Sequence, residues 1–226
     1  MDSINAKSVR DELCRELVRF FGLKTPAYVK PGVLVLNTSG NFLGALQVTV
    51  SRNKGCYVVD PGIVIFWDRF SQALSDVLAG ATFGSTTPKR GGAPCISRHY
   101  AALLFKRQKA EGIIDPGKMK QFPDLFVGEA SQIPDAARRI WAIHKEVGED
   151  FLAAWSSFES AVKFLGLDED APGSWRPLLE FLLLSEVNGL ASACSWCLDS
   201  SRESSGLYRT QFGREQLQWI RANFCS

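Results

Sequence analysis

The spacing of hydrophobic residues changes sharply along this chain, and that change constrains the fold more than any motif does. Residues 46–51 (LQVTVS) alternate apolar and polar side chains, a pattern typical of a half-buried strand. Turn-forming sequences flank this segment, at 38–41 (TSGN) and 52–55 (RNKG). Because short turns favour antiparallel pairing, residues 28–66 are predicted to form a three-stranded meander.

The third strand of this meander contains a proline. Residues 56–66 are apolar enough for a buried strand, but Asp60, Pro61 and Gly62 stand in the middle. Proline cannot donate to a strand ladder, so the sequence predicts a break or bulge at this point.

A helix is predicted before the meander. Ser3 is a candidate N-cap, Gly22 would end the helix after Phe21, and the spacing of three and four residues places apolar side chains on one face. The apolar residues are Val9, Leu13, Leu17 and Phe20. Arg15 and Arg19 lie within helical reach of Asp11, Glu12 and Glu16.

The remainder of the chain is mostly helical in pattern. Residues 67–78 favour a helix, 80–93 form a long loop that is either mobile or functional, and 96–105 fit a strand or a short helix equally well. After Pro134, which suits the first turn of a helix, an apolar stripe continues to residue 165 with an interruption at Gly148. Further helices are predicted at 175–187, 191–202 and 214–224.

These patterns predict an α+β fold, with a small antiparallel sheet packed by an N-terminal helix and a mostly helical C-terminal half. The helix and sheet region spans 1–112 and the helical region spans 133–226, with a boundary in between. We expect the two to pack as one compact unit.

Composition excludes several classes of protein. The N-terminus has no basic segment followed by an apolar one, so we expect no signal peptide, and no apolar run is long enough to span a bilayer. We therefore expect a cytoplasmic protein with its six cysteines mostly reduced. Charge is uneven: residues 1–112 carry 15 basic and 8 acidic side chains, whereas the remainder carries 11 and 16.

Catalytic and metal-binding motifs are not apparent in the sequence. Cys194 and Cys197 have the spacing of a zinc or redox pair, but a second pair is missing and Cys225 is isolated. We interpret them as small buried thiols on a helix. The chain also lacks phosphate-loop, dinucleotide and nucleophile-elbow patterns. We therefore expect a protein that is not an enzyme and needs no cofactor or metal.

Two alternatives remain open. His144 lies on an apolar helical stripe and is interpreted as a hydrogen-bonded, partly buried histidine. The first alternative is an enzyme of unrecognised type, in which Cys95 and His99 of the 80–99 loop would act together with a carboxylate. The basic stretch 89–109 interleaves Lys and Arg with Tyr100 and Phe105, which could contact nucleic acid. We consider a nucleic-acid partner unlikely, because no recognised binding module accompanies the stretch.

The first third of the chain resembles small bacterial domains of unknown function. The residues that carry this resemblance are 21–24 (FGLK), the extended segment 28–36, and the strands at 46–51 and 58–63. Such domains have an opening helix, a meander and trailing helices, and several accompany polymorphic or secreted toxins as immunity proteins. The resemblance implies a non-catalytic partner-binding role and transfers no catalytic residue.

The predicted function is therefore protein binding, most specifically as an immunity protein that covers the active site of a cognate bacterial toxin. If the toxin is a nuclease with a basic groove, the acidic half of the chain is the better candidate for the binding surface. The candidate residues are Glu146, Glu149, Asp150, Asp168, Glu169 and Asp170.

Overall fold

A computed structural model describes residues 5–24, 31–39, 42–67, 70, 96–113, 125–167, 176–201 and 206–225. The chain divides into two units: Met1–Ile65 with Ser97–Leu152, and Phe66–Ile96 with Ala153–Ser226. This division differs from the predicted regions 1–112 and 133–226, because the chain leaves the first unit near the end of β3 and later returns to it. The predicted boundary at 112–133 lies inside the first unit. The α+β class is confirmed.

The first unit is built on the antiparallel meander that the sequence predicts. Strands β1 (Val33–Ser39), β2 (Phe42–Asn53) and β3 (Cys56–Trp67) are consecutive neighbours in the sheet. Positive φ angles at Lys54 (36°) and Gly55 (89°) make the tight connection between β2 and β3. Strand β4 (Ile96–His99) follows β3 in the sheet order, and β5 (Leu125–Val127) also pairs with β3.

Strand β3 is continuous through Pro61, so of the predicted break or bulge, the break is wrong. The β5 pairing covers Tyr57 to Val59 and ends just before this point. At Gly62 a side chain would meet the backbone oxygen of Arg98, 2.7 Å away, so β4 approaches there. Pro61 thus falls where β3 changes partner along its edge, a place where a missing N–H donor is tolerated.

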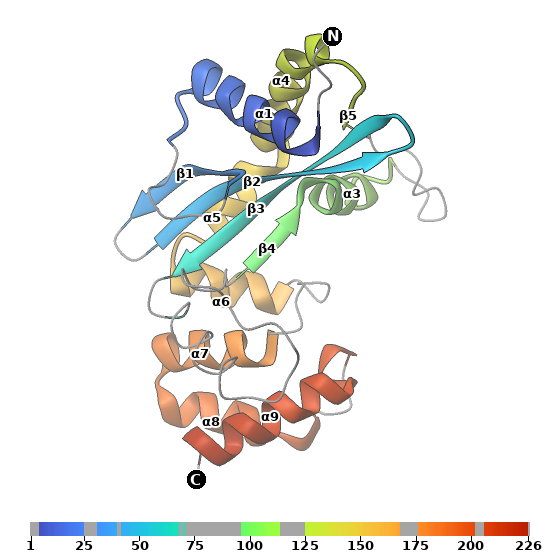
Figure 1. The fold of residues 1–226 in the computed structure, drawn as a ribbon. Coiled ribbons are helices and arrows are strands. Elements are labelled where there is room, and N and C mark those ends of the chain that lie inside the picture. Colours follow the sequence, from blue (N-terminus) through green and yellow to red (C-terminus); the bar gives the residue numbers. More distant parts are fainter. Residues whose placement is uncertain are drawn as a thin grey trace. The chain divides into compact units, whose positions relative to one another are not determined.

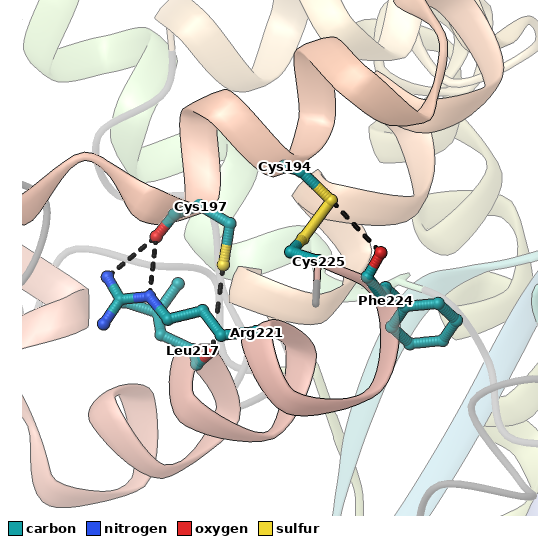
Figure 2. Close-up of a disulfide and its surroundings, with 6 residues drawn as sticks. All are labelled: Cys194, Cys197, Leu217, Arg221, Phe224 and Cys225. Atoms are coloured by element: carbon teal, nitrogen blue, oxygen red, sulfur yellow. Dashed lines mark hydrogen bonds between the residues drawn. A yellow bond between two sulfur atoms is a disulfide. The ribbon is translucent and has the colours of Figure 1, made fainter.

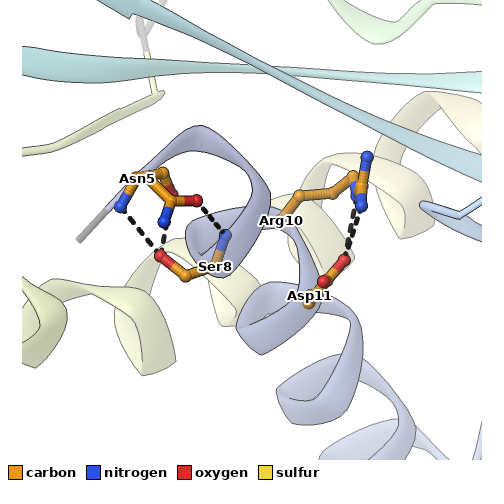
Figure 3. A network of polar contacts seen from close by, with 4 residues as sticks. All are labelled: Asn5, Ser8, Arg10 and Asp11. Carbon is orange, nitrogen blue, oxygen red and sulfur yellow. Dashed lines mark hydrogen bonds and ion pairs between the residues drawn. The ribbon is translucent and has the colours of Figure 1, made fainter.

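Helix α1 (Ala6–Phe21) buries its apolar face as expected, with Val9, Leu13 and Leu17 fully covered. Its N-cap is Asn5 rather than Ser3, because Ser8 completes a reciprocal capping box with Asn5 (Figure 3). Gly22 ends the helix in the left-handed conformation, with φ of 64°.

The surface of α1 carries the predicted ion pairs in part. Arg15 pairs with Glu12 and Arg19 with Glu16, whereas Asp11 pairs with its neighbour Arg10 (Figure 3). Phe20, predicted on the apolar face, is 38% exposed. The guanidinium groups of Arg19 and Arg138 lie over its ring, at 4.4 Å and 5.1 Å.

Residues 96–105, whose sequence fitted a strand or a short helix equally well, contain both: strand β4 is followed directly by helix α3 (Tyr100–Ala110). A three-residue 3₁₀ turn, η2 (Ala130–Gln132), precedes α4 (Ile133–Ile143), and Pro134 lies in the first turn of α4 as expected. Five π-helical residues (His144–Gly148) then lead into α5 (Glu149–Ala154). We call these five residues the π-segment. Helix α1 packs against both β2 and α4 (Figure 1).

The second unit is helical in its described part. It contains α6 (Phe158–Leu167), α7 (Arg176–Asn188), α8 (Leu190–Leu198), a 3₁₀ turn η5 (Gly206–Arg209) and α9 (Gln211–Phe224). Helix α7 packs against α6, α8 and α9. An aromatic cluster packs around α6 in this unit; it consists of Trp67, Phe70, Trp155, Phe158 and Phe164.

The apolar stripe predicted from Ile140 to residue 165 falls on two separate helical stretches, and these belong mainly to different units. The chain leaves helix at Trp155–Ser157, beyond the predicted interruption at Gly148. The predicted 175–187, 191–202 and 214–224 helices are present with shifted ends. Most of the predicted 67–78 helix and the whole 80–93 loop lie outside the described residues.

Candidate functional site on the π-segment and α3

Three of the six predicted binding residues lie close together in the first unit. Glu146 belongs to the π-segment, Glu149 and Asp150 begin α5, and all three are exposed. The other three, Asp168, Glu169 and Asp170, lie outside the described residues. We call Glu146, Glu149 and Asp150 the acidic face.

Basic side chains border this face. Lys145 Nζ lies 2.5 Å from Glu149 Oε1, and its hydrogen bond holds the pKa of Glu149 below the usual range. Arg107 of α3 donates to the backbone oxygen of Glu146 and pairs with Glu111 at 2.9 Å. Among the described residues, the carboxylates of Glu146 and Asp150 have no ion-pair partner within 4 Å. They are the part of the face that a charged partner could use.

The π-segment is fixed from its buried side by a hydrogen bond to α3. The Tyr100 hydroxyl lies 2.7 Å from Nδ1 of His144, and the two side chains are only 1% and 3% exposed. This confirms the interpretation of His144 as a hydrogen-bonded histidine. Gly148 makes room for the pair, because a Cβ there would overlap His144 and lie 3.1 Å from the Tyr100 ring. Insertions of this kind in a helix are often found at functional sites.

Burial also determines the protonation of the pair. Desolvation lowers the pKa of His144 to about 4, while the charge of Glu149 raises it and that of Lys145 lowers it by smaller amounts. Desolvation likewise raises the pKa of the Tyr100 hydroxyl well above its ordinary value. Both groups are therefore neutral near pH 7, and the hydrogen bond joins two uncharged partners.

Aromatic packing extends this support to α1. Trp141, one turn before the π-segment, stacks on Phe21 with ring centroids 4.6 Å apart, and its ring lies 4.9 Å from that of His144. Lys145 lies 5.4 Å from the centre of the Trp141 ring. The segment that bears the acidic face is thus anchored to both α1 and α3.

A small pocket of about 200 Å³ lies between β2, β3, β5, α3 and α4. Its lining is mostly apolar and consists of Ser51, Val58, Val59, Asp60, Pro61, Tyr100, Ala101, Leu104, Leu125 and Ile143. Asp60, one of the polar lining residues, pairs with His99 at 2.9 Å. Both side chains are substantially exposed, at 46% and 61%.

This Asp60–His99 pair is part of the arrangement that the enzyme hypothesis requires. It brings a carboxylate to His99, which the sequence did not predict. Cys95, the proposed nucleophile, lies outside the described residues. Of the basic stretch 89–109, Lys89 and Arg90 also lie outside them, while Lys106, Arg107 and Lys109 are exposed on α3.

The cysteines of the second unit differ from expectation. Cys194 forms a disulfide with Cys225, 31 residues away, so the interpretation of Cys194 as a reduced thiol and of Cys225 as isolated is wrong (Figure 2). Pairing between helices α8 and α9 leaves no local signal in the sequence. Cys197 is a buried thiol outside any disulfide, as predicted.

Within the described ranges, no group of three or more His, Cys, Asp or Glu side chains could hold a metal ion. The same residues include no helix that is long and apolar enough to cross a membrane. No protein-family model matches the chain, and no curated protein or solved structure matches it significantly.

Proposed function

We propose that this chain is a non-catalytic protein-binding protein, and specifically an immunity protein that inhibits a cognate bacterial toxin in the cytoplasm. The observation that carries the proposal is a fixed acidic face. Glu146, Glu149 and Asp150 are exposed on a segment that the buried Tyr100–His144 hydrogen bond holds in place. An inhibitor needs a preorganised, complementary surface and no chemistry of its own.

The charge of this face indicates the kind of partner. Lys145 pairs with Glu149, whereas the exposed Glu146 and Asp150 interact electrostatically with Arg107 without an ion-pair contact among the described residues. A toxin with a basic, phosphate-binding groove would be attracted to these carboxylates, and the attraction would speed association. A nuclease is therefore the toxin class that we propose.

The experiment that tests the proposal is affinity capture from the native host with the tagged full chain, followed by mass spectrometry. Support requires a single stoichiometric partner that is toxic when expressed alone. Its capture must also be weakened in a Glu146→Lys/Asp150→Lys variant. Asp135→Lys is the matched control, because Asp135 is an exposed acid on α4 of the same unit. An empty capture at low salt would overturn tight protein inhibition.

A second variant set addresses the acids outside the described residues. Reversing Asp168, Glu169 and Asp170 together tests whether that segment contributes to binding. If capture is lost only in this variant set, the protein-binding role is supported, but the binding surface lies at residues 168–170 and not at the acidic face.

A second candidate function is supported by the Asp60–His99 pair beside the pocket. A carboxylate that orients a histidine is the arrangement that activates a thiol nucleophile, and Cys95 is four residues from His99. This candidate predicts fast alkylation of Cys95 by iodoacetamide below pH 7 that slows in His99→Gln. Site-resolved mass spectrometry separates Cys95 from the free thiols Cys14 and Cys56. Equal rates in the two proteins would exclude it.

A further inference from the structure

The disulfide of the second unit joins two helices near the end of α9. Cys194 lies in the middle of α8 and Cys225 directly follows α9. Both cysteines are partly accessible to solvent rather than buried. The Cys194 sulfur also lies 3.4 Å from the backbone oxygen of Phe224 (Figure 2). A disulfide whose cysteines are partly accessible is open to attack by an external thiolate.

Helix α9 is held to α8 and α7 by contacts other than the disulfide. Arg221 donates from both Nε and Nη2 to the backbone oxygen of Cys197, at 3.0 Å and 2.7 Å, which caps the C-terminal end of α8 (Figure 2). Leu217 and Ile220 are fully buried, and the buried Gln216 side chain accepts from the backbone N–H of Leu178. The body of α9 therefore stays in place whether or not the disulfide is intact.

The position of the last residues of α9 depends on the disulfide much more than the position of the helix body does. Ala222, Asn223 and Phe224 are exposed, and the ring of Phe224 lies 5.3 Å from that of Phe181 and 5.6 Å from that of Trp219. The Asn223 side chain donates to the backbone oxygen of Trp219, and the backbone N–H of Cys225 donates to that of Arg221. Phe181 is only 1% exposed. Opening of this last turn would withdraw Phe224 and uncover part of the Phe181 and Trp219 rings.

We propose that Cys194 and Cys225 form a reversible redox site that controls the last turn of α9. A dithiol reductant supplies the electrons: one thiolate attacks a sulfur of the disulfide, the S–S bond breaks, and the other cysteine leaves as a thiolate and takes up a proton. The second thiol of the reductant then resolves the mixed disulfide. The cysteines gain two electrons and two protons, and the reductant becomes a disulfide.

The reverse step needs a disulfide oxidant of the glutathione class. Cys197 lies one helical turn from Cys194 and is buried, with its thiol directed at the backbone oxygen of Leu217, 3.7 Å away. Burial keeps Cys197 out of the exchange, so re-oxidation restores the Cys194–Cys225 pair. This redox site lies in the second unit and is independent of the proposed toxin-binding role.

Hydrogen exchange of the full chain tests the proposal directly. We expect reduction by a phosphine to speed amide exchange at 222–225 by about tenfold or more, while 213–221 keep their protection. Cys225→Ser should behave as the reduced protein does, and Cys197→Ala should still respond to reductant. Unchanged exchange at 222–225 would overturn the proposal. So would simultaneous loss of protection along the whole of α9.

Arg221→Lys provides a second, independent test. Lysine cannot form the two-pronged contact to the Cys197 oxygen, so the reduced variant should lose protection over 213–221, whereas the oxidised variant should keep it. Equal protection of 213–221 in both redox states of this variant would contradict the proposal that Arg221 holds the body of α9 when the disulfide is open.

Reversibility is tested in glutathione buffers by trapping thiols with an alkylating agent and measuring peptide masses. We expect the Cys194–Cys225 pair to pass from oxidised to reduced as the ratio of glutathione to its disulfide rises, and to return when the ratio is lowered. A disulfide that resists every ratio, or never forms, would overturn the proposal.

Discussion

The hydroxyl of Tyr100 and Nδ1 of His144 form a buried hydrogen bond, 2.7 Å long, between residues 44 positions apart in sequence. This bond joins the start of α3 to the start of the π-segment. We therefore expect Tyr100→Phe to destabilise the first unit by about 1–3 kcal/mol, because the imidazole loses its buried partner. Denaturant unfolding gives the value.

Gly148→Ala tests the fit around the same pair. The added methyl group would overlap His144 and press on the Tyr100 ring, so we expect a loss of about 1–3 kcal/mol. Gly128→Ala is the matched control, since its nearest neighbour there would be Gln132 Oε1 at 3.5 Å. The control should change the free energy of unfolding by less than about 0.5 kcal/mol. Equal effects of the two substitutions would contradict the packing described here.

The stability of the first unit should depend on pH through His144. Its pKa is about 4 in the folded chain and about 6.5 when unfolded, so between these values the unfolded chain binds more protons. Stability is therefore fully present above about pH 6.5 and falls as the pH drops towards 4, by roughly 2–3 kcal/mol.

Denaturant unfolding at several pH values measures this slope. His144→Gln should flatten it, because glutamine does not titrate. A slope that survives in His144→Gln would assign the pH dependence to other groups.

Reduction of the Cys194–Cys225 disulfide should lower the stability of the second unit. The bond closes a loop of 31 residues, for which the restriction of the unfolded chain corresponds to about 3–4 kcal/mol. Thermal unfolding with and without reductant measures the effect. Cys14→Ser, which removes a free thiol of the other unit, should leave the difference between the two conditions intact.

Local patterns in the sequence were sufficient to predict the meander, α1 and most later helices, because alternation and helical spacing report which face of an element is buried. The acidic face was predicted from charge alone, and the buried state of His144 from its place on an apolar stripe. Features that join distant residues were not predictable in this way. Tyr100 pairs with His144, Asp60 with His99 and Cys194 with Cys225 only because the folded chain brings them together.

The association rate of the captured partner tests the central claim most directly. We would measure it for the wild-type chain, for Glu146→Lys/Asp150→Lys and for the Asp135→Lys control, at low and at high salt. The acidic-face variant should associate at least about tenfold more slowly at low salt, with the difference shrinking as salt screens the charges, while the control stays close to wild type. Equal rates for all three proteins at low salt would contradict a binding role for the acidic face.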